Sequence, residues 1–243
     1  MTVLAIRTLA RCVAAIALSW AVVAGAGLGS ARAQNISPRL FGSIEFIGGS
    51  LEALPQWTRV LRKIQAEEAV YQSCDRGQEN KDISACPSPA IAAWRDHVRS
   101  LKGLPPGRQL GELNSFLNRW IYRLDEENFN VEDYWASPLE FLARSGDCED
   151  YAIIKYVSLK ALGFDVKDLR IVVVQDVVRN LPHAVLAIYH EGDILIMDSL
   201  FEGVLPHSQV TFYRPYYSVN ETTRWAHVPT RPRRRLIPPG VTR

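Results

Sequence analysis

The chain places its apolar residues at helical spacing in its first half and in short β-branched runs in its second half. Three segments with the helical period are predicted to bury one face in a core. Their apolar stripes are Trp57, Val60, Leu61 and Ile64; Ile91, Trp94, Val98 and Leu101; and Leu110, Leu113, Leu117, Ile121 and Leu124. Residues 148–162 are apolar on nearly all sides, which is typical of a buried central helix, and Gly163 is placed to end it.

The hydrophobic period changes after Gly163. Predicted strands cover residues 169–178, 183–189, 194–198, 211–217 and 225–228, and residues 34–49 are predicted to be extended. Because helices come first and strands afterwards, we expect an α+β fold with the helices packed on an antiparallel sheet.

The first 33 residues have the features of a secretory signal peptide. Arg7 and Arg11 precede a short apolar stretch at residues 12–28, and Ala31-Arg32-Ala33 is a cleavage motif before Gln34. An uncleaved membrane anchor is the alternative, but the stretch is short for a membrane span. We therefore expect export to the periplasm with cleavage near Ala33, one domain over residues 34–230, and a flexible basic tail over residues 231–243.

Removal of the leader changes the charge balance. It takes three arginines and no acid from the 28 basic and 26 acidic residues, which leaves 25 against 26 and a net charge near −1. The mature chain then has no global positive field, so we expect no nucleic-acid partner and no stable membrane insertion after cleavage.

Three cysteines remain after the leader is removed. Cys74 and Cys86 enclose a polar loop between two helical patterns, and a disulfide between them suits an oxidising compartment. The alternative is two unpaired thiols. With the disulfide formed, Cys148 is the one free thiol.

Cys148 lies in the run Ser145-Gly146-Asp147-Cys148-Glu149-Asp150-Tyr151, which opens the apolar helix. A helix N-terminus favours a thiolate, and a thiolate is a nucleophile. Three neighbouring carboxylates have the opposite effect. A buried cysteine that serves as a small apolar side chain is the alternative interpretation.

A cysteine nucleophile needs a base and an orienting partner. His183 begins an apolar strand, and Asp198 ends the next one. If Glu191 and Gly192 form a two-residue hairpin loop, His183 and Asp198 are diagonal neighbours on one face at about 7–8 Å; a three-residue loop would separate them. A buried polar histidine and a turn-capping aspartate are the alternatives. The expected oxyanion donor is the Cys148 backbone N–H with one side chain. Trp135 is a candidate for the latter, although it also suits a buried aromatic position.

The acids beside Cys148 allow two interpretations. Asp147 can be the N-cap residue of the helix, with the other acids favoured by the helix dipole. Alternatively, Asp147, Glu149 and Asp150 can bind a hard cation such as calcium, which takes carboxylate oxygens. A divalent cation would also cancel the repulsion between these acids and a thiolate.

Six stretches of the chain carry a family resemblance. They are Leu40-Phe41-Gly42, Leu54-Pro55-Gln56-Trp57, Asp133-Tyr134-Trp135-Ala136-Ser137-Pro138, Gly146-Asp147-Cys148-Glu149-Asp150-Tyr151-Ala152, His183-Ala184-Val185-Leu186 and Tyr217-Ser218-Val219-Asn220-Glu221. In these stretches the chain resembles the bacterial transglutaminase-like cysteine proteinases, which include the LapG-type adhesin-releasing proteases of the periplasm.

The resemblance implies a papain-like or transglutaminase-like fold and a catalytic triad of Cys148, His183 and Asp198. It also implies a calcium site at Asp147 and Glu149, with Asp150 as a weaker candidate. The implied activity is calcium-dependent cleavage of the N-terminal region of a large cell-surface adhesin, which controls biofilm attachment. An inner-membrane receptor for cyclic di-GMP is the implied inhibitor. A transglutaminase-type acyl transferase and a non-catalytic calcium-dependent binding module are the alternatives.

Overall fold

The computed structural model describes residues 38–80 and 82–230, so the predicted signal peptide and the predicted basic tail lie outside the described residues. The α-helices are α1 (Pro55–Glu79), α2 (Pro89–Ser100), α3 (Pro106–Leu117), α4 (Asp125–Phe129), α5 (Pro138–Arg144) and α6 (Cys148–Ala161). The strands are β1 (Ser43–Ile47), β2 (Leu169–Asp176), β3 (Leu181–His190), β4 (Asp193–Met197), β5 (Leu205–Pro206), β6 (Tyr213–Val219) and β7 (Arg224–Pro229). Short 3₁₀ turns are η1 (Leu40–Gly42), η2 (Leu51–Ala53), η3 (Ile83–Ala85), η4 (Val166–Asp168) and η5 (His207–Gln209).

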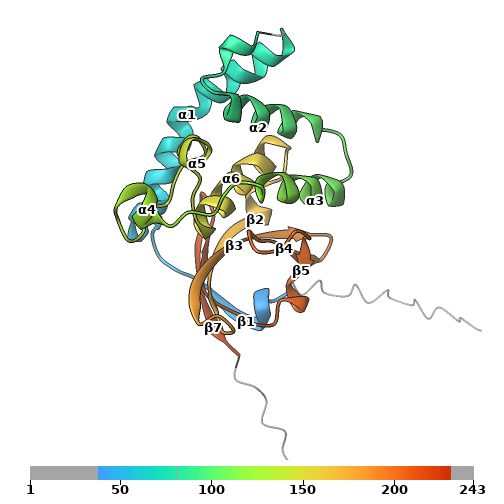
Figure 1. The fold of residues 1–243 in the computed structure, drawn as a ribbon. Coiled ribbons are helices and arrows are strands. Elements are labelled where there is room, and N and C mark those ends of the chain that lie inside the picture. The colour runs from blue at the N-terminus through green and yellow to red at the C-terminus, as the bar shows by residue number, and fades with distance from the viewer. Residues whose placement is uncertain (1–37, 81, 231–243) are drawn as a thin grey trace, which may run out of the picture. The chain divides into compact units, whose positions relative to one another are not determined.

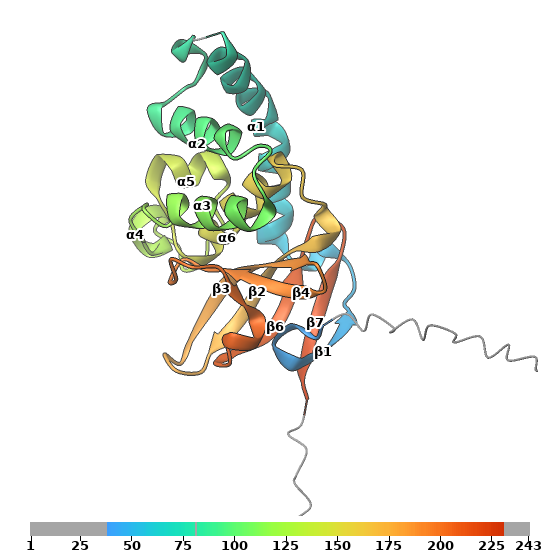
Figure 2. The same cartoon turned by 90° about the vertical axis from the view of Figure 1, so that its right-hand side faces the viewer.

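The strands form one antiparallel sheet in the order β1-β7-β6-β2-β3-β4-β5, and the helices lie on one side of it (Figures 1 and 2). The α+β prediction is therefore confirmed. The five predicted strands correspond to β2, β3, β4, β6 and β7. Strand β1 lies within residues 34–49, which were predicted to be extended, whereas β5 was not predicted.

Helix α6 lies between the sheet and the other helices, as its apolar sequence predicts. It packs on β2 and β3 on one side and on α3 and α5 on the other. Its residues Ile153, Ile154 and Leu159 are fully buried in the core between the helical layer and the sheet. Gly163 follows the helix with a φ of +96°, a conformation that glycine adopts without the steric cost of a side chain.

A second, smaller core covers the opposite face of the sheet. Val172 and Val174 of β2 point into it, alternating with Ile171, which belongs to the larger core. Leu40 of η1 and Val210, just after η5, pack against this face. The sheet is thus buried on both faces at its strands β2 and β3.

The apolar stripe predicted for the third helix is wrong at its C-terminal end. Helix α3 ends at Leu117, and Ile121 and Leu124 are 70% and 51% exposed. The side-chain amide of Asn118, the C-cap residue, instead donates hydrogen bonds to the carbonyls of Asp198 and Phe201. These contacts belong to the tertiary structure, and a helical period does not reveal them.

The predicted disulfide between Cys74 and Cys86 is present, and it links the end of α1 to the segment before α2. Within residues 38–80 and 82–230, none of the helices combines the length and the apolar character needed to cross a bilayer.

Candidate active site

The free thiol, Cys148, is the first residue of α6, and Asp147 is the N-cap residue. The turn before it is tight, because Ser145 has a positive φ of 68°. A Cβ atom on Gly146 would lie 2.0 Å from Oδ2 of Asp150 and 2.7 Å from its Cβ. Only glycine fits there, and its lack of a side chain lets Asp150 fold back to accept a 3.3 Å hydrogen bond from the Asp147 N–H.

His183 and Asp198 meet as the hairpin argument predicts. Glu191 and Gly192 form the two-residue loop, both with positive φ as in a type I′ turn, and His190 pairs with Asp193. Nε2 of His183 lies 2.8 Å from Oδ1 of Asp198. Both residues are almost fully buried.

Asp198 has two further donors. The Tyr213 hydroxyl donates to Oδ2 at 2.6 Å, and the Leu200 N–H donates to Oδ1 at 3.0 Å. Although burial opposes it, the hydrogen bond and charge of His183 together with these donors lower the pKa of Asp198. The carboxylate therefore remains ionised and fixes the imidazole, with Nδ1 as the ring nitrogen that Asp198 does not engage. Tyr213 comes from β6, and its contact with Asp198 is not revealed by any local sequence pattern.

The thiol lies against the start of β3. Burial raises the pKa of the Cys148 thiol most, and the Ala184 N–H, next to His183 in the chain, acts in the opposite direction. Because α6 packs directly on β3, Cys148 and the His183–Asp198 pair come from neighbouring elements.

The other histidines have different partners. His97 stacks on Phe116, and Nδ1 of His207 accepts a hydrogen bond from the Phe41 N–H at 3.1 Å. His227 is buried on β7, and its two nitrogens hydrogen-bond hydroxyls of β1 and β6 at 2.8 Å each. Two flanking strands cover it, a contact that its local sequence does not reveal.

Five carboxylates surround the start of α6. Three groups each hold their ligand atoms within 4.8 Å of one another: Asp147, Cys148 and Glu149; Asp125, Asp133 and Glu149; and Asp125, Asp147 and Asp150. Asp147, Glu149 and Asp150 were predicted from the sequence as candidate cation ligands, whereas Asp125 and Asp133 were not. Asp133 opens the Asp133-Tyr134-Trp135 stretch used for the family resemblance, which was the available signal.

Without a cation, these carboxylates repel one another when they are ionised, and burial removes the water that would solvate them. Oδ1 of Asp125 and Oδ1 of Asp147 are buried without a hydrogen-bond partner among the described residues. Burial, then the charge of Glu149, raises the pKa of Asp147 to about 9, and burial together with the charge of Asp150 raises the pKa of Glu149 to about 7. Burial followed by Glu149 and Asp147 raises the pKa of the Cys148 thiol, which donates a 3.2 Å hydrogen bond to Glu149. The oxygen-rich donor set and the unpartnered oxygens fit a hard divalent cation such as calcium.

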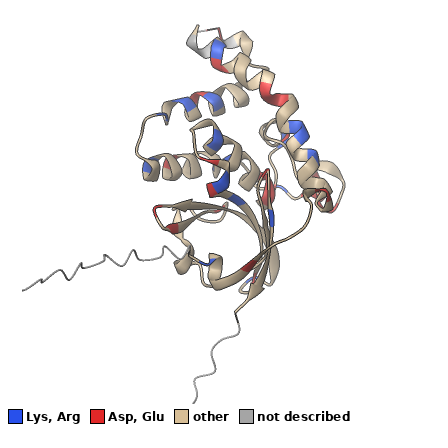
Figure 3. Ribbon diagram, turned by 180° about the vertical axis from the view of Figure 1, so that it is seen from behind, with Lys and Arg blue, Asp and Glu red and all other residues tan. Residues whose placement is uncertain are grey.

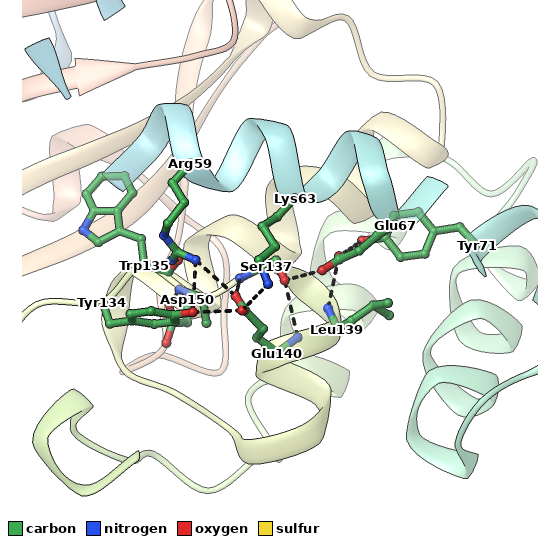
Figure 4. A network of polar contacts seen from close by, with 11 residues as sticks. Arg59, Lys63, Glu67, Tyr71, Tyr134, Trp135, Ser137, Leu139, Glu140 and Asp150 are labelled. Carbon is green, nitrogen blue, oxygen red and sulfur yellow. Dashed lines mark hydrogen bonds and ion pairs between the residues drawn. The ribbon is translucent and has the colours of Figure 1, made fainter. Parts of the chain in front are cut away.

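A polar network on α1 holds the segment that supports these acids (Figure 4). Arg59 donates to the Trp135 carbonyl, and Lys63 pairs with Glu140 at 2.8 Å. The segment in turn donates main-chain hydrogen bonds to the acids, from the Tyr134 N–H to Asp125 at 2.6 Å and from the Ala136 N–H to Asp150 at 2.5 Å. Helix α1 carries residues of both charge signs, as Figure 3 shows.

Trp135 does not serve as a free donor. Its indole N–H donates to Oδ1 of Asp133 at 3.1 Å, and the ring is 5% exposed and packs edge-on against Trp57. The buried aromatic position is therefore the correct interpretation of this residue.

Comparisons with known proteins agree with this geometry. Residues 97–232 match the family model of the bacterial transglutaminase-like cysteine proteinases. The calcium-bound structure of Legionella pneumophila LapG is similar at 36% identity and a TM-score of 0.56, over 63% of this chain and 87% of that one. The EGTA-treated structure of the same protein is similar at 35% identity and a TM-score of 0.54, over 65% of this chain and 84% of that one. No curated protein matches the chain.

Proposed function

Because this chain belongs to the bacterial transglutaminase-like cysteine proteinases, we propose that it is a calcium-dependent cysteine endopeptidase. Its proposed substrate is the N-terminal region of a large cell-surface adhesin, whose release controls biofilm attachment. The observation that carries the proposal is the site itself, where a free thiol at a helix N-terminus lies beside a buried His183–Asp198 pair.

Cys148, His183 and Asp198 are the proposed catalytic residues. His183 takes the thiol proton on Nδ1, while its Nε2–H donates to Asp198 at 2.8 Å. The thiolate attacks the scissile carbonyl, and His183 then gives the proton to the leaving amine. Water hydrolyses the thioester in the second half of the reaction. Asp198 holds the tautomer and stabilises the imidazolium.

Asp147 and Glu149 are the proposed calcium ligands, with Asp125, Asp133 and Asp150 completing the acidic site. Bound calcium supplies positive charge that offsets the repulsion between these carboxylates and the Cys148 thiolate. The likeness to Legionella LapG, which has a calcium-bound structure and an EGTA-treated one, supports this assignment. With calcium bound, the carboxylates would repel the Cys148 thiolate less. His183 would then deprotonate the Cys148 thiol more readily.

The proposed location is the periplasm, reached through the signal peptide predicted at residues 1–33. Its proposed regulator is an inner-membrane receptor for cyclic di-GMP that inhibits the protease. This regulator rests on the family resemblance alone.

The test combines a purified N-terminal adhesin fragment with the protease and reads the products by mass spectrometry. We expect cleavage in calcium, none in EGTA, and none from Cys148→Ala. If a primary amine is added and the product carries that amine, the enzyme is an acyl transferase. If wild type binds the fragment and leaves it intact, the chain is a binding module.

Metal binding has a separate readout that does not need activity. Calcium should raise the melting temperature of Cys148→Ala, because a ligand that binds only the folded state stabilises it. Asp125→Asn should reduce that rise, while Asp96→Asn, whose side chain is 64% exposed on α2, should leave it unchanged. An equal calcium response in all three variants would contradict the proposed site.

A further inference from the structure

Acyl transfer at Cys148 places negative charge on the substrate carbonyl oxygen, and such an oxygen is stabilised by fixed hydrogen-bond donors. One donor follows from the helix. Cys148 is the first residue of α6, so its backbone N–H has no acceptor within the helix. A second donor must come from another segment, and the indole N–H of Trp135 is already taken by Asp133.

Tyr122 is held next to the nucleophile from two sides. Its backbone forms a β-bridge with Gly146, and the Arg123 N–H donates to the Gly146 carbonyl at 2.9 Å. Its ring stacks on Tyr151, with centroids 6.2 Å apart and planes 14° from parallel. Gly146 precedes Cys148 by two residues and Tyr151 follows it by three, so both contacts fix the ring beside the thiol.

The segment that carries Tyr122 is itself hydrogen-bonded to residues on both sides of Cys148. The Tyr151 hydroxyl donates to the Trp120 carbonyl at 2.5 Å, and the Ser145 hydroxyl donates to the Ile121 carbonyl. These bonds explain why the chain leaves the helical path after Leu117 and exposes Ile121. The Ile121 side chain is thus exposed because these hydrogen bonds hold its segment against the residues around Cys148.

Burial, and after it the charge of Cys148, raises the pKa of Tyr122, so the hydroxyl lies close to the sulfur. The side chain is 46% exposed, so a substrate can approach the space between the hydroxyl and the thiol from solvent. A phenol remains protonated at neutral pH and can both donate and accept hydrogen bonds. The hydroxyl can therefore donate a hydrogen bond to a group bound next to the thiol.

We propose that Tyr122 is a catalytic residue whose hydroxyl completes the oxyanion hole together with the Cys148 N–H. This inference rests on the proposed acyl chemistry at Cys148. As the C–S bond forms, the carbonyl π pair moves onto oxygen and accepts both hydrogen bonds. When the C–N bond breaks, that pair re-forms the carbonyl, and His183 protonates the departing amine. Tyr122 keeps its proton throughout.

The test compares two reactions of the same thiol in Tyr122→Phe. p-Nitrophenyl acetate acylates Cys148 through an oxyanion, whereas iodoacetamide alkylates it at a saturated carbon and forms none. Loss of one oxyanion donor should slow acylation by about 100-fold or more. Alkylation should change by less than about threefold, because it follows the thiolate fraction and its access.

The matched control is Tyr216→Phe. Tyr216 is 52% exposed on β6, and its hydroxyl donates to Gln175, so both rates should equal those of wild type. If both reactions slow together in Tyr122→Phe, the hydroxyl acts on the thiol and the inference is wrong. If neither reaction slows, it is also wrong. A selective loss of acylation supports the inference even where wild type leaves the adhesin fragment intact, because acylation of Cys148 by the ester does not depend on the adhesin.

Discussion

Lys155 is a buried cation in α6, two helical turns after Cys148. Its side chain is fully buried, and Nζ has no hydrogen-bond partner among the described residues. Nζ lies 5.7 Å from the ring centroid of Tyr151. Burial lowers the pKa of Lys155 from 10.5 to about 7, and the charge of Asp198 only partly opposes this effect. Replacing the lysine with methionine should therefore stabilise the fold.

The size of the gain depends on pH. The folded protein holds the Lys155 proton less tightly than the unfolded chain does, so the penalty is complete below about pH 7 and fades as pH approaches 10.5. A shift of this size corresponds to about 4–5 kcal/mol of unfolding free energy at pH 6 and to about 1 kcal/mol at pH 10. Lys155→Met should thus be stabilised far more at pH 6 than at pH 10.

Urea denaturation of wild type and Lys155→Met at pH 6, 8 and 10, at constant calcium, measures these differences. Lys167→Met is the matched control, because the Lys167 side chain is 74% exposed and its loss should change stability little at any of these pH values. A gain that is the same at pH 6 and pH 10, or a loss of stability at pH 6, would refute the reasoning.

Three further predictions follow from the geometry. Gly146→Ala should abolish cleavage and destabilise the protein by about 2 kcal/mol or more, measured by activity and urea denaturation, because the new Cβ would collide with Asp150. Replacing Cys74 and Cys86 together with serine should lower the unfolding free energy by about 2–4 kcal/mol while the folded enzyme keeps its kcat; an unchanged melting temperature would count against a stabilising disulfide. Asp198→Asn should lower kcat by about 10⁴-fold, because the imidazole tautomer is no longer fixed; stopped-flow acylation at wild-type rates would reject that role.

The sequence predicted those parts of the fold that depend on neighbouring residues, namely one helix and one hairpin. Helix α6 follows from an apolar run closed by Gly163, and the β3–β4 register follows from a two-residue turn at Glu191 and Gly192. That register is what brought His183 and Asp198 together on one face. These predictions depend on periods and turn geometry, and both can be worked out from neighbouring residues.

The remaining parts of the site depend on contacts between distant segments. Asp125 and Asp133 reach the start of α6 from the loop region around α4, where no hydrophobic period is present. Tyr213 reaches Asp198 across the sheet from β6. The apolar stripe that included Ile121 predicted a longer α3. The helix instead ends at Leu117, and the Ile121 carbonyl accepts a hydrogen bond from the Ser145 hydroxyl. Such bonds join segments that are distant in the sequence, so local patterns do not predict them.

The central claim is that Cys148 releases a surface adhesin. The most direct measurement is a mass-spectrometric comparison of proteins shed by cells of the source bacterium that carry wild type or Cys148→Ala. We expect wild-type cells to shed one large adhesin that is truncated in its N-terminal region, and this adhesin to stay attached to cells with Cys148→Ala. Equal shedding of all surface proteins by both strains would contradict the central claim.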